Sequence, residues 1–489
     1  MRKYFKATAV LGVPNFIKLI TGVIKNKVIA IILGAEGLGI VSMSFYAINT
    51  LIPLSILGSE LSVIKYTAES KTNEEAHRVL LAGIFFVVFN SFVLIISLLI
   101  FKQVLSLWIF RDKNYLYAIF WIALAFPFYS LSEIIVHYLK GRKFITQFAI
   151  ATSIAAILSL CISVPLIYYL GIKGCFLQIL TTGLISFVVL AAPIFKEKGI
   201  FINIKNVLGF LRLFKSLIKT GFLLYFIPRI FYIFTLFLVK IMIIKNFGFK
   251  SNGIYESITF LSVVIFSFLS DTLMGYFLPV ICNNIDVDKK NNELNEVIRF
   301  IILISVPIIV ITGIYIGRFL LKILFSNQFL LAFEFLPFRF IGDYFYLINS
   351  ALTFIFMAQS NYKVVLMVSI IYNGLILSLS FLLPIYVGFK GYFMAYLLAA
   401  FLIFIMISLI LKKRHTIRIF KQNYNIILFS ALVMIACFFL AQNKYLQFII
   451  IPIIIIWLFA NFSVEELRRH WKSIKESSLF KNRLRKNEL

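Results

Sequence analysis

The chain has 489 residues, of which 61% are hydrophobic and only 14% are charged, and its mean hydropathy is +0.98. This composition excludes a soluble globular protein, which could not bury so much apolar surface. The formal net charge of +28 does not require a nucleic acid, because most Lys and Arg residues lie in loops beside apolar runs.

Apolar runs of about 20 residues recur along the chain, and this is the length of helix that crosses about 30 Å of hydrocarbon. Hydropathy predicts about fourteen transmembrane helices, and therefore an all-α polytopic membrane protein. We expect no cleavable signal peptide, because the charged start leads directly into a long helix. In chain order the predicted helices cover residues 7–33, 38–63, 80–101, 115–138, 146–169, 174–195, 219–244, 254–281, 298–321, 334–358, 363–387, 391–411, 425–441 and 446–462.

The first twelve predicted helices form two sets of six. Residues 33–40 return as residues 247–254 about 214 positions later, and residues 170–176 return as residues 387–393 about 217 positions later. Six helices per half keep the halves parallel, related by an axis along the membrane normal. The predicted domains are an N-terminal six-helix lobe (1–195), a cytoplasmic linker (196–218), a C-terminal six-helix lobe (219–411), an additional two-helix segment (412–462) and a basic cytoplasmic tail (463–489).

The distribution of cations predicts the orientation. If the N-terminus is cytoplasmic, the inner segments hold about 32 Lys and Arg residues and the outer segments about 10. This bias predicts that both termini are cytoplasmic. The basic tail suits anionic lipid headgroups, so we expect membrane lipids as partners and no nucleic acid. The four cysteines lack the spacing of metal ligands, and no metal or cofactor is expected: Cys161, Cys175, Cys282 and Cys437.

Several short motifs carry a family resemblance. They are Lys18 and Lys27 in the first helix, Leu33-Gly34-Ala35-Glu36-Gly37-Leu38-Gly39, Leu57-Gly58, Lys65-Tyr66-Thr67-Ala68-Glu69, and Tyr138-Leu139-Lys140-Gly141-Arg142 after the fourth helix. With these motifs, about residues 1–411 resemble the Wzx-type O-antigen flippases, in the polysaccharide exporter branch of the multidrug/oligosaccharidyl-lipid/polysaccharide (MOP) superfamily.

The resemblance implies two six-helix lobes around a central cavity. It implies as cargo a polyprenyl-pyrophosphate-linked oligosaccharide, an O-antigen or other surface polysaccharide repeat unit, moved by alternating access from the cytoplasmic to the outer leaflet of the bacterial inner membrane. It also implies a polysaccharide polymerase and chain-length regulator proteins as partners. The chain departs from many Wzx-type proteins by two additional helices, and such a pair resembles the pair that lines a lipid-tail groove in lipid II flippases.

Ionisable residues within predicted spans are candidates for cargo binding, because each costs at least about 2.5–3.5 kcal/mol at a helix centre. Lys18 lies near the middle of the first helix, and Lys25 projects from the same face. Arg229 lies near the middle of the seventh helix, the repeat partner of the first, next to a proline that can kink it. We expect Lys18 and Arg229 to contact the pyrophosphate, with Lys25 and Arg339 as further substrate-binding candidates and no catalytic residue.

Each candidate has a structural alternative. Lys25, Lys27 and Lys240 can extend to the membrane interface instead. Arg229 can pair with a carboxylate such as Asp271 or Glu256, and two helix pairs of opposite charge, Arg339 with Asp343 and Glu133 with His137, can be structural. The second of these pairs can also act as a proton relay. Three tyrosines are candidates to stack on sugar rings, although packing is the commoner role: Tyr46, Tyr225 and Tyr232.

Two other functions remain open. A cation-coupled multidrug exporter of the same superfamily favours an acidic cavity, whereas the first and seventh helices carry cations and no acid. A membrane polymerase or glycosyltransferase acting on lipid-linked sugars needs a sizeable catalytic loop, and the longest predicted outer segment, residues 102–114, is short. The sequence also has no phosphate-binding Gly-Lys-Ser/Thr loop, so we expect a transporter that is not an enzyme.

Overall fold

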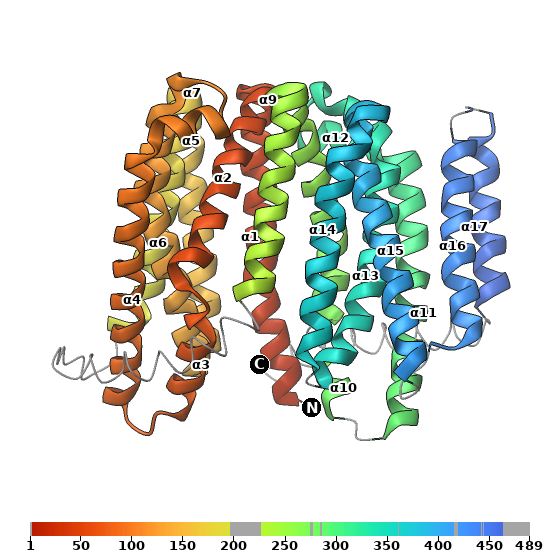
Figure 1. Cartoon of the computed structure of the whole chain (residues 1–489), viewed down its shortest axis with the longest axis horizontal. Helices are drawn as coiled ribbons and strands as arrows, with labels where there is room; N and C mark the ends of the chain where they lie inside the picture. The colour runs from red at the N-terminus through yellow and green to blue at the C-terminus, as the bar shows by residue number, and fades with distance from the viewer. Residues whose placement is uncertain are drawn as a thin grey trace, which may run out of the picture. The chain divides into compact units, whose positions relative to one another are not determined.

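The computed structural model describes residues 2–195, 226–273, 277–283, 286–359, 361–414, 419–441, 443 and 445–462. Within these residues the chain forms helices and no strand (Figure 1). The α-helices are α1 (Arg2–Ile32), α2 (Gly34–Ile56), α3 (Ser59–Glu69), α4 (Asn73–Ile100), α5 (Lys102–Ile109), α6 (Leu116–Gly141), α7 (Ile145–Phe195), α9 (Ile227–Thr272), α10 (Leu278–Asn283), α11 (Val287–Val310), α12 (Gly317–Leu324), α13 (Leu336–Ala358), α14 (Tyr362–Val387), α15 (Gly391–Arg414), α16 (Lys421–Leu440) and α17 (Gln447–Asn461). Shorter helical turns are η1 (Lys113–Tyr115), η5 (Ile311–Ile316), η6 (Asn327–Phe335) and η7 (Gly388–Lys390).

The predicted class of an all-helical, multi-pass membrane protein is confirmed. In the described part of the chain, nine helical stretches are long and apolar enough to span a membrane. They are Gly34–Ile56, Asn73–Ile100, Lys113–Gly141, Ile145–Phe195, Ile227–Ser267, Val287–Leu324, Asn327–Ala358, Tyr362–Lys413 and Lys421–Leu440, and α17 is a shorter apolar helix. The predicted outer loop at residues 102–114 is largely helical, because α5 occupies most of it.

Some of these stretches are too long to be single spans. A straight helix of the length of α7, 51 residues, would measure about 76 Å, more than twice the hydrocarbon thickness. The helix is interrupted at Gly171, which has φ 58° and ψ −129°. A Cβ built on Gly174 would lie 1.9 Å from the carbonyl oxygen of Leu166, so the chain turns back on itself here.

The same reversal occurs in the second half. Gly388 ends α14 with φ 64° and ψ −148°, and a Cβ built on Gly391 would lie 2.7 Å from the carbonyl carbon of Leu383. Gly388 and Leu383 each follow their first-half counterparts by about 217 positions. Glycines with positive φ also mark the α1–α2 turn, at Gly34, and the middle of α9, at Gly248, about 214 positions apart. The repeat read from the sequence therefore recurs in the backbone conformation.

Helix α2 packs against the second part of α9 at very close range. A Cβ built on Gly39 would lie 2.1 Å from the carbonyl oxygen of Phe249, and one built on Gly253 would lie 1.8 Å from that of Ala35. These contacts are related by the same offset of about 214 positions, so they form a pair about a local two-fold axis. Small residues permit such backbone approach between membrane helices.

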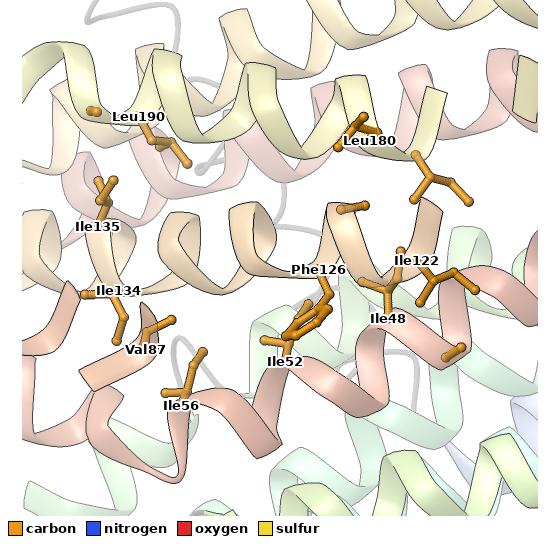
Figure 2. Packing of buried hydrophobic residues seen from close by; sticks show 14 of the residues in the cluster. Ile48, Ile52, Ile56, Val87, Ile122, Phe126, Ile134, Ile135, Leu180 and Leu190 are labelled. Atoms are coloured by element: carbon orange, nitrogen blue, oxygen red, sulfur yellow. The ribbon is translucent and has the colours of Figure 1, made fainter. Parts of the chain in front are cut away.

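The first half has an apolar core between α2, α4, α6 and α7. Figure 2 shows Ile48 and Ile52 of α2 beside Ile122 and Phe126 of α6, and Ile56 beside Val87 of α4. β-Branched and aromatic side chains fill this space in a few well-defined rotamers, which fixes the relative positions of these helices.

The described residues form two compact units. The first contains Met1–Asn283 and Arg318–Ile410, and the second contains Asn284–Gly317 and Leu411–Leu489. Within the second unit α11 packs against α16, where the amide of Asn423 donates to Oδ1 of Asn295 at 2.8 Å. All the candidate site residues that the structure describes lie in the first unit. The domain boundaries predicted from sequence remain predictions, and residues 196–218 and 463–489 lie outside the described part.

The α2–α9 crossing can be tested by adding one methyl group. Gly253→Ala places a Cβ against backbone atoms, which no rotamer change can move away. We therefore expect the free energy of unfolding to fall by about 1–3 kcal/mol, and the unfolding temperature in detergent to fall with it. Gly374→Ala in α14 is the matched control, because its Cβ would meet no heavy atom within 4 Å. Equal unfolding temperatures for the two variants would contradict the crossing.

Candidate functional site

A break in a membrane helix creates the first cluster of charged residues. Helix α2 ends at Ile56, both Leu57 and Gly58 have positive φ, and the chain restarts as α3. Glu60 therefore lies in the first turn of α3, where free backbone N–H groups and the helix dipole stabilise a carboxylate. Its side chain is only 2% exposed, and Oε1 accepts a hydrogen bond of 2.8 Å from Nη1 of Arg229.

Glu133 links three other side chains into one set: Arg229, His137 and Lys18. Oε1 of Glu133 on α6 lies 3.8 Å from Nη2 of Arg229, and Nδ1 of His137 lies 2.7 Å from the backbone oxygen of Glu133. Lys18 is exposed on α1, and within the described residues its Nζ makes no hydrogen bond or ion pair, although Glu133 lies within electrostatic range. We call Lys18, Glu60, Glu133, His137 and Arg229 the arginine cluster.

The arginine cluster brings together two predicted cargo-binding residues from repeat-related helices. Arg229 retains 26% exposure, so its guanidinium is accessible even though Glu60 holds one edge. Of the two alternative partners expected for Arg229, Glu256 pairs with Lys240 instead. The side chain of Asp271 lies outside the described residues, so that alternative stays a prediction. The predicted kink at Pro228 also cannot be followed, since the preceding residues are not described.

A second set of charges lies directly beside the α2–α9 crossing. Lys240 is 0% exposed, and its Nζ lies 2.6 Å from Oε2 of Glu256 and 3.3 Å from Oγ of Ser42. The amide of Asn252 also donates to the carbonyl oxygen of Gly39, at 2.8 Å. The prediction that Lys240 can extend to the membrane interface is wrong, because a carboxylate and two polar side chains hold it in the interior.

The predicted helix pair of Arg339 and Asp343 on α13 is formed. Nε of Arg339 lies 3.2 Å from Oδ1 of Asp343, and both residues are buried. The hydroxyl of Tyr396 on α15 donates to Oδ1 of Asp343 at 2.8 Å, and that of Ser262 on α9 donates to Oδ2 at 2.5 Å. Three helices thus hold the pair, and both carboxylate oxygens of Asp343 have partners.

Tyrosines from five helices lie within electrostatic range of Arg339. The guanidinium of Arg339 lies 4.0 Å from the ring centroid of Tyr396, and Nζ of Lys240 lies 4.4 Å from that of Tyr46. We call this set the tyrosine cluster: Tyr46 of α2, Tyr232 and Tyr255 of α9, Tyr346 of α13, Tyr372 of α14 and Tyr396 of α15. Tyr225, the other tyrosine proposed from sequence, lies outside the described residues.

Two other lysines of α1, Lys25 and Lys27, have different surroundings. Nζ of Lys27 donates to the carbonyl oxygens of Lys322 at 3.0 Å and Phe325 at 2.5 Å, so it caps the C-terminal end of α12. Nζ of Lys25 lies 4.8 Å from the ring centroid of Phe45. The structure therefore does not bring Lys25 into an ion pair with either cluster.

Sequence reasoning missed Glu60. It lies within an apolar run, where a carboxylate has a high free-energy cost, and this cost would have identified it as a candidate site residue. No local sequence feature predicts that Ser262 or Tyr396 contacts Asp343, because both contacts form only in the tertiary structure. Among the residues that the structure describes, no group of three or more His, Cys, Asp or Glu side chains is arranged to hold a metal ion.

Comparison with solved structures identifies the fold. The lipid II flippase MurJ in an inward closed conformation superposes with a TM-score of 0.68 at 17% identity, over 92% of this chain and 97% of that one. An inward-facing multidrug resistance MATE family transporter of the MOP superfamily gives 0.65 at 14% identity, over 84% and 99%. The chain has the fold of MOP superfamily transporters.

The match extends to other members. A MOP superfamily transporter from Pyrococcus furiosus, described as having a binding pocket of reverse polarity, gives a TM-score of 0.57 at 16% identity, over 83% of this chain and 96% of that one. No family model matches the sequence, and no curated protein matches it. The similar structures are transporters and not enzymes. At these identities the comparison establishes the fold, while the Wzx branch remains a resemblance.

The Glu60–Arg229 pair can be measured with a double-mutant cycle. Arg229→Gln leaves a buried carboxylate unpaired, so we expect a lower unfolding temperature than in the Glu60→Gln/Arg229→Gln double variant, with a coupling of about 1–3 kcal/mol. The matched control is the exposed Glu74–Arg78 pair on α4, whose coupling should be below about 1 kcal/mol. Additive effects of Glu60→Gln and Arg229→Gln would show that the two residues do not interact.

Proposed function

We propose that this protein is a flippase that moves a polyprenyl-pyrophosphate-linked oligosaccharide, and that the arginine cluster binds the pyrophosphate. The observation that carries the proposal is that Glu133 lies in range of two cations on repeat-related helices: a partly exposed Arg229, and an exposed Lys18 whose Nζ makes no hydrogen bond or ion pair among the described residues. A pyrophosphate carries about two negative charges and cannot cross hydrocarbon without cationic partners. Arg229 adds a planar fork that suits two phosphate oxygens.

Glu60 gives this cluster a means of responding to the cargo. A pyrophosphate that binds Arg229 competes with the Glu60 carboxylate for the same guanidinium. Helix α3 belongs to the first half of the chain and α9 to the second. Loading would therefore weaken a contact between the halves, which is a physical link between binding and alternating access.

A cation-coupled drug exporter is the second candidate, since MATE transporters share the fold. Such a site needs a carboxylate that is free to bind a cation. Glu256 is engaged by Lys240 and Asp343 by Arg339, so neither of these carboxylates offers an uncompensated charge. The match to MurJ also covers 92% of the chain against 84% for the MATE transporter, a difference close to the length of α16 and α17.

The expected location is the bacterial inner membrane, with both termini cytoplasmic, and transport runs toward the outer leaflet. The orientation of the termini rests on the positive-inside distribution of Lys and Arg, and the direction of transport rests on the resemblance to the Wzx-type flippases. Membrane lipids, a polysaccharide polymerase and chain-length regulator proteins are the expected partners. A polymerase or glycosyltransferase activity of the chain itself is the remaining alternative, and glycan elongation in the assay below would reveal it.

The proposal predicts flipping in proteoliposomes that contain a fluorescent polyprenyl-pyrophosphate oligosaccharide. Protein should raise the fraction of label reached by a membrane-impermeant quencher. Lys18→Gln should slow this exchange about tenfold or more, because a charge-assisted contact contributes about 1.5–3 kcal/mol. The Glu60→Gln/Arg229→Gln variant should lose transport as well, although it removes one charge of each sign and so leaves the net charge unchanged.

Lys173→Gln is the matched control, since it removes one exposed cation outside the cluster and should flip normally. Folding of each variant is checked by size-exclusion chromatography. Normal flipping by both cluster variants would refute the pyrophosphate site. No flipping by the folded wild-type protein, with ion gradients and a membrane potential applied, would refute the flippase.

A further inference from the structure

We propose that the tyrosine cluster binds the sugar portion of the cargo and selects cargo by its glycan; this inference rests on the proposed flippase function. Six tyrosines from both halves of the chain lie within electrostatic range of Arg339, and Tyr396 contacts both Arg339 and Asp343. Two of them keep substantial surface: Tyr232 is 42% exposed and Tyr346 is 37% exposed. An exposed ring beside a buried polar pair offers an apolar face and hydrogen-bonding groups together.

The charges of this cluster favour an uncharged ligand. Lys240 is neutralised by Glu256, and Arg339 by Asp343. Both cations also lie over tyrosine rings, Lys240 over Tyr46 and Arg339 over Tyr396. A bare anion or cation therefore finds no spare counter-charge at these pairs. A sugar suits them better, because its C–H faces stack on aromatic rings and its hydroxyls exchange hydrogen bonds with carboxylate, guanidinium and phenol groups.

Helix α9 joins the two clusters. Arg229 and Tyr232 are three residues apart, so their side chains are neighbours on the helix surface. Lys240 follows on nearly the same side, about 16 Å along the axis from Arg229. A lipid-linked oligosaccharide held at Arg229 by its pyrophosphate would place its first sugars along this side, next to Tyr232. The two parts of the cargo thus meet two sites of matching chemistry in one compact unit.

The test compares two probes on the purified full-length protein. One is the pool of polyprenyl-pyrophosphate oligosaccharides extracted from the source cells, and the other is polyprenyl pyrophosphate without sugar. We expect wild type to bind the first at least about tenfold more tightly than the second. Tyr232→Ala/Tyr346→Ala should reduce this ratio to about one to two while leaving the affinity for the sugar-free lipid unchanged.

Two control variants test whether the loss of any two tyrosines has the same effect and whether the aromatic ring or the hydroxyl is needed. Tyr169→Ala/Tyr386→Ala removes two tyrosines that are 80% and 82% exposed, and should keep the wild-type ratio. Tyr232→Phe/Tyr346→Phe retains both rings and should keep most of the ratio.

The outcomes separate this inference from the proposed function. A wild type that flips and binds both probes equally overturns the sugar site alone. So does an alanine variant that keeps the preference, or one that loses affinity for both probes alike. A folded wild type that binds neither probe and does not flip overturns both proposals.

Discussion

Two helices from different halves of the chain, α2 and α9, approach backbone to backbone where Gly39 meets Phe249 and Gly253 meets Ala35. No side chain separates them there, so polar groups just beyond the crossing are brought together away from lipid. The buried amide of Asn252 reaches the carbonyl of Gly39, and the adjacent Lys240 finds its hydroxyl and carboxylate partners. Loss of the crossing would leave an unpaired cation in the interior, which is far more costly than the loss of one packing contact.

Charge pairing sets the difference between the two clusters. In the tyrosine cluster the ion pairs are buried, short and supported by hydroxyls, so they behave as fixed dipoles. In the arginine cluster the pairing is incomplete, because Lys18 has no ion-pair partner among the described residues and Arg229 is partly exposed. A charged ligand gains most where charge is not yet compensated, and a neutral ligand gains most where hydrogen-bonding groups are already oriented. If the protein moves a lipid-linked oligosaccharide as proposed, the two clusters would suit different parts of that amphiphilic cargo.

Much of this fold follows from local sequence. Hydropathy gives the spans, and glycines at repeated offsets mark reversals such as those at Gly171 and Gly388, because only glycine takes these backbone conformations readily. Arg229 was identifiable by its cost in a membrane helix. Its partner was not, because Glu60 lies 169 positions away and becomes adjacent only when α3 packs near α9. The prediction that Lys240 extends to the membrane interface was wrong for the same reason. The position of Lys240 along its helix does not show that Glu256, which follows the turn at Gly248, packs against it.

The two halves differ in the polar residues beside the crossing. The positions that correspond to Asn252 and Glu256 in the first half are Leu38 and Ser42, about 214 residues earlier. An apolar residue and a small hydroxyl there cannot neutralise a buried lysine, and Lys27, the counterpart of Lys240, instead caps the end of α12. The duplicated backbone thus supplies two equivalent contacts to one crossing, but only the second half adds a carboxylate and an amide beside it. This asymmetry allows the tyrosine cluster and the arginine cluster to differ in chemistry. A strictly symmetric chain would instead have two similar sites, which would not match the unlike ends of the proposed cargo.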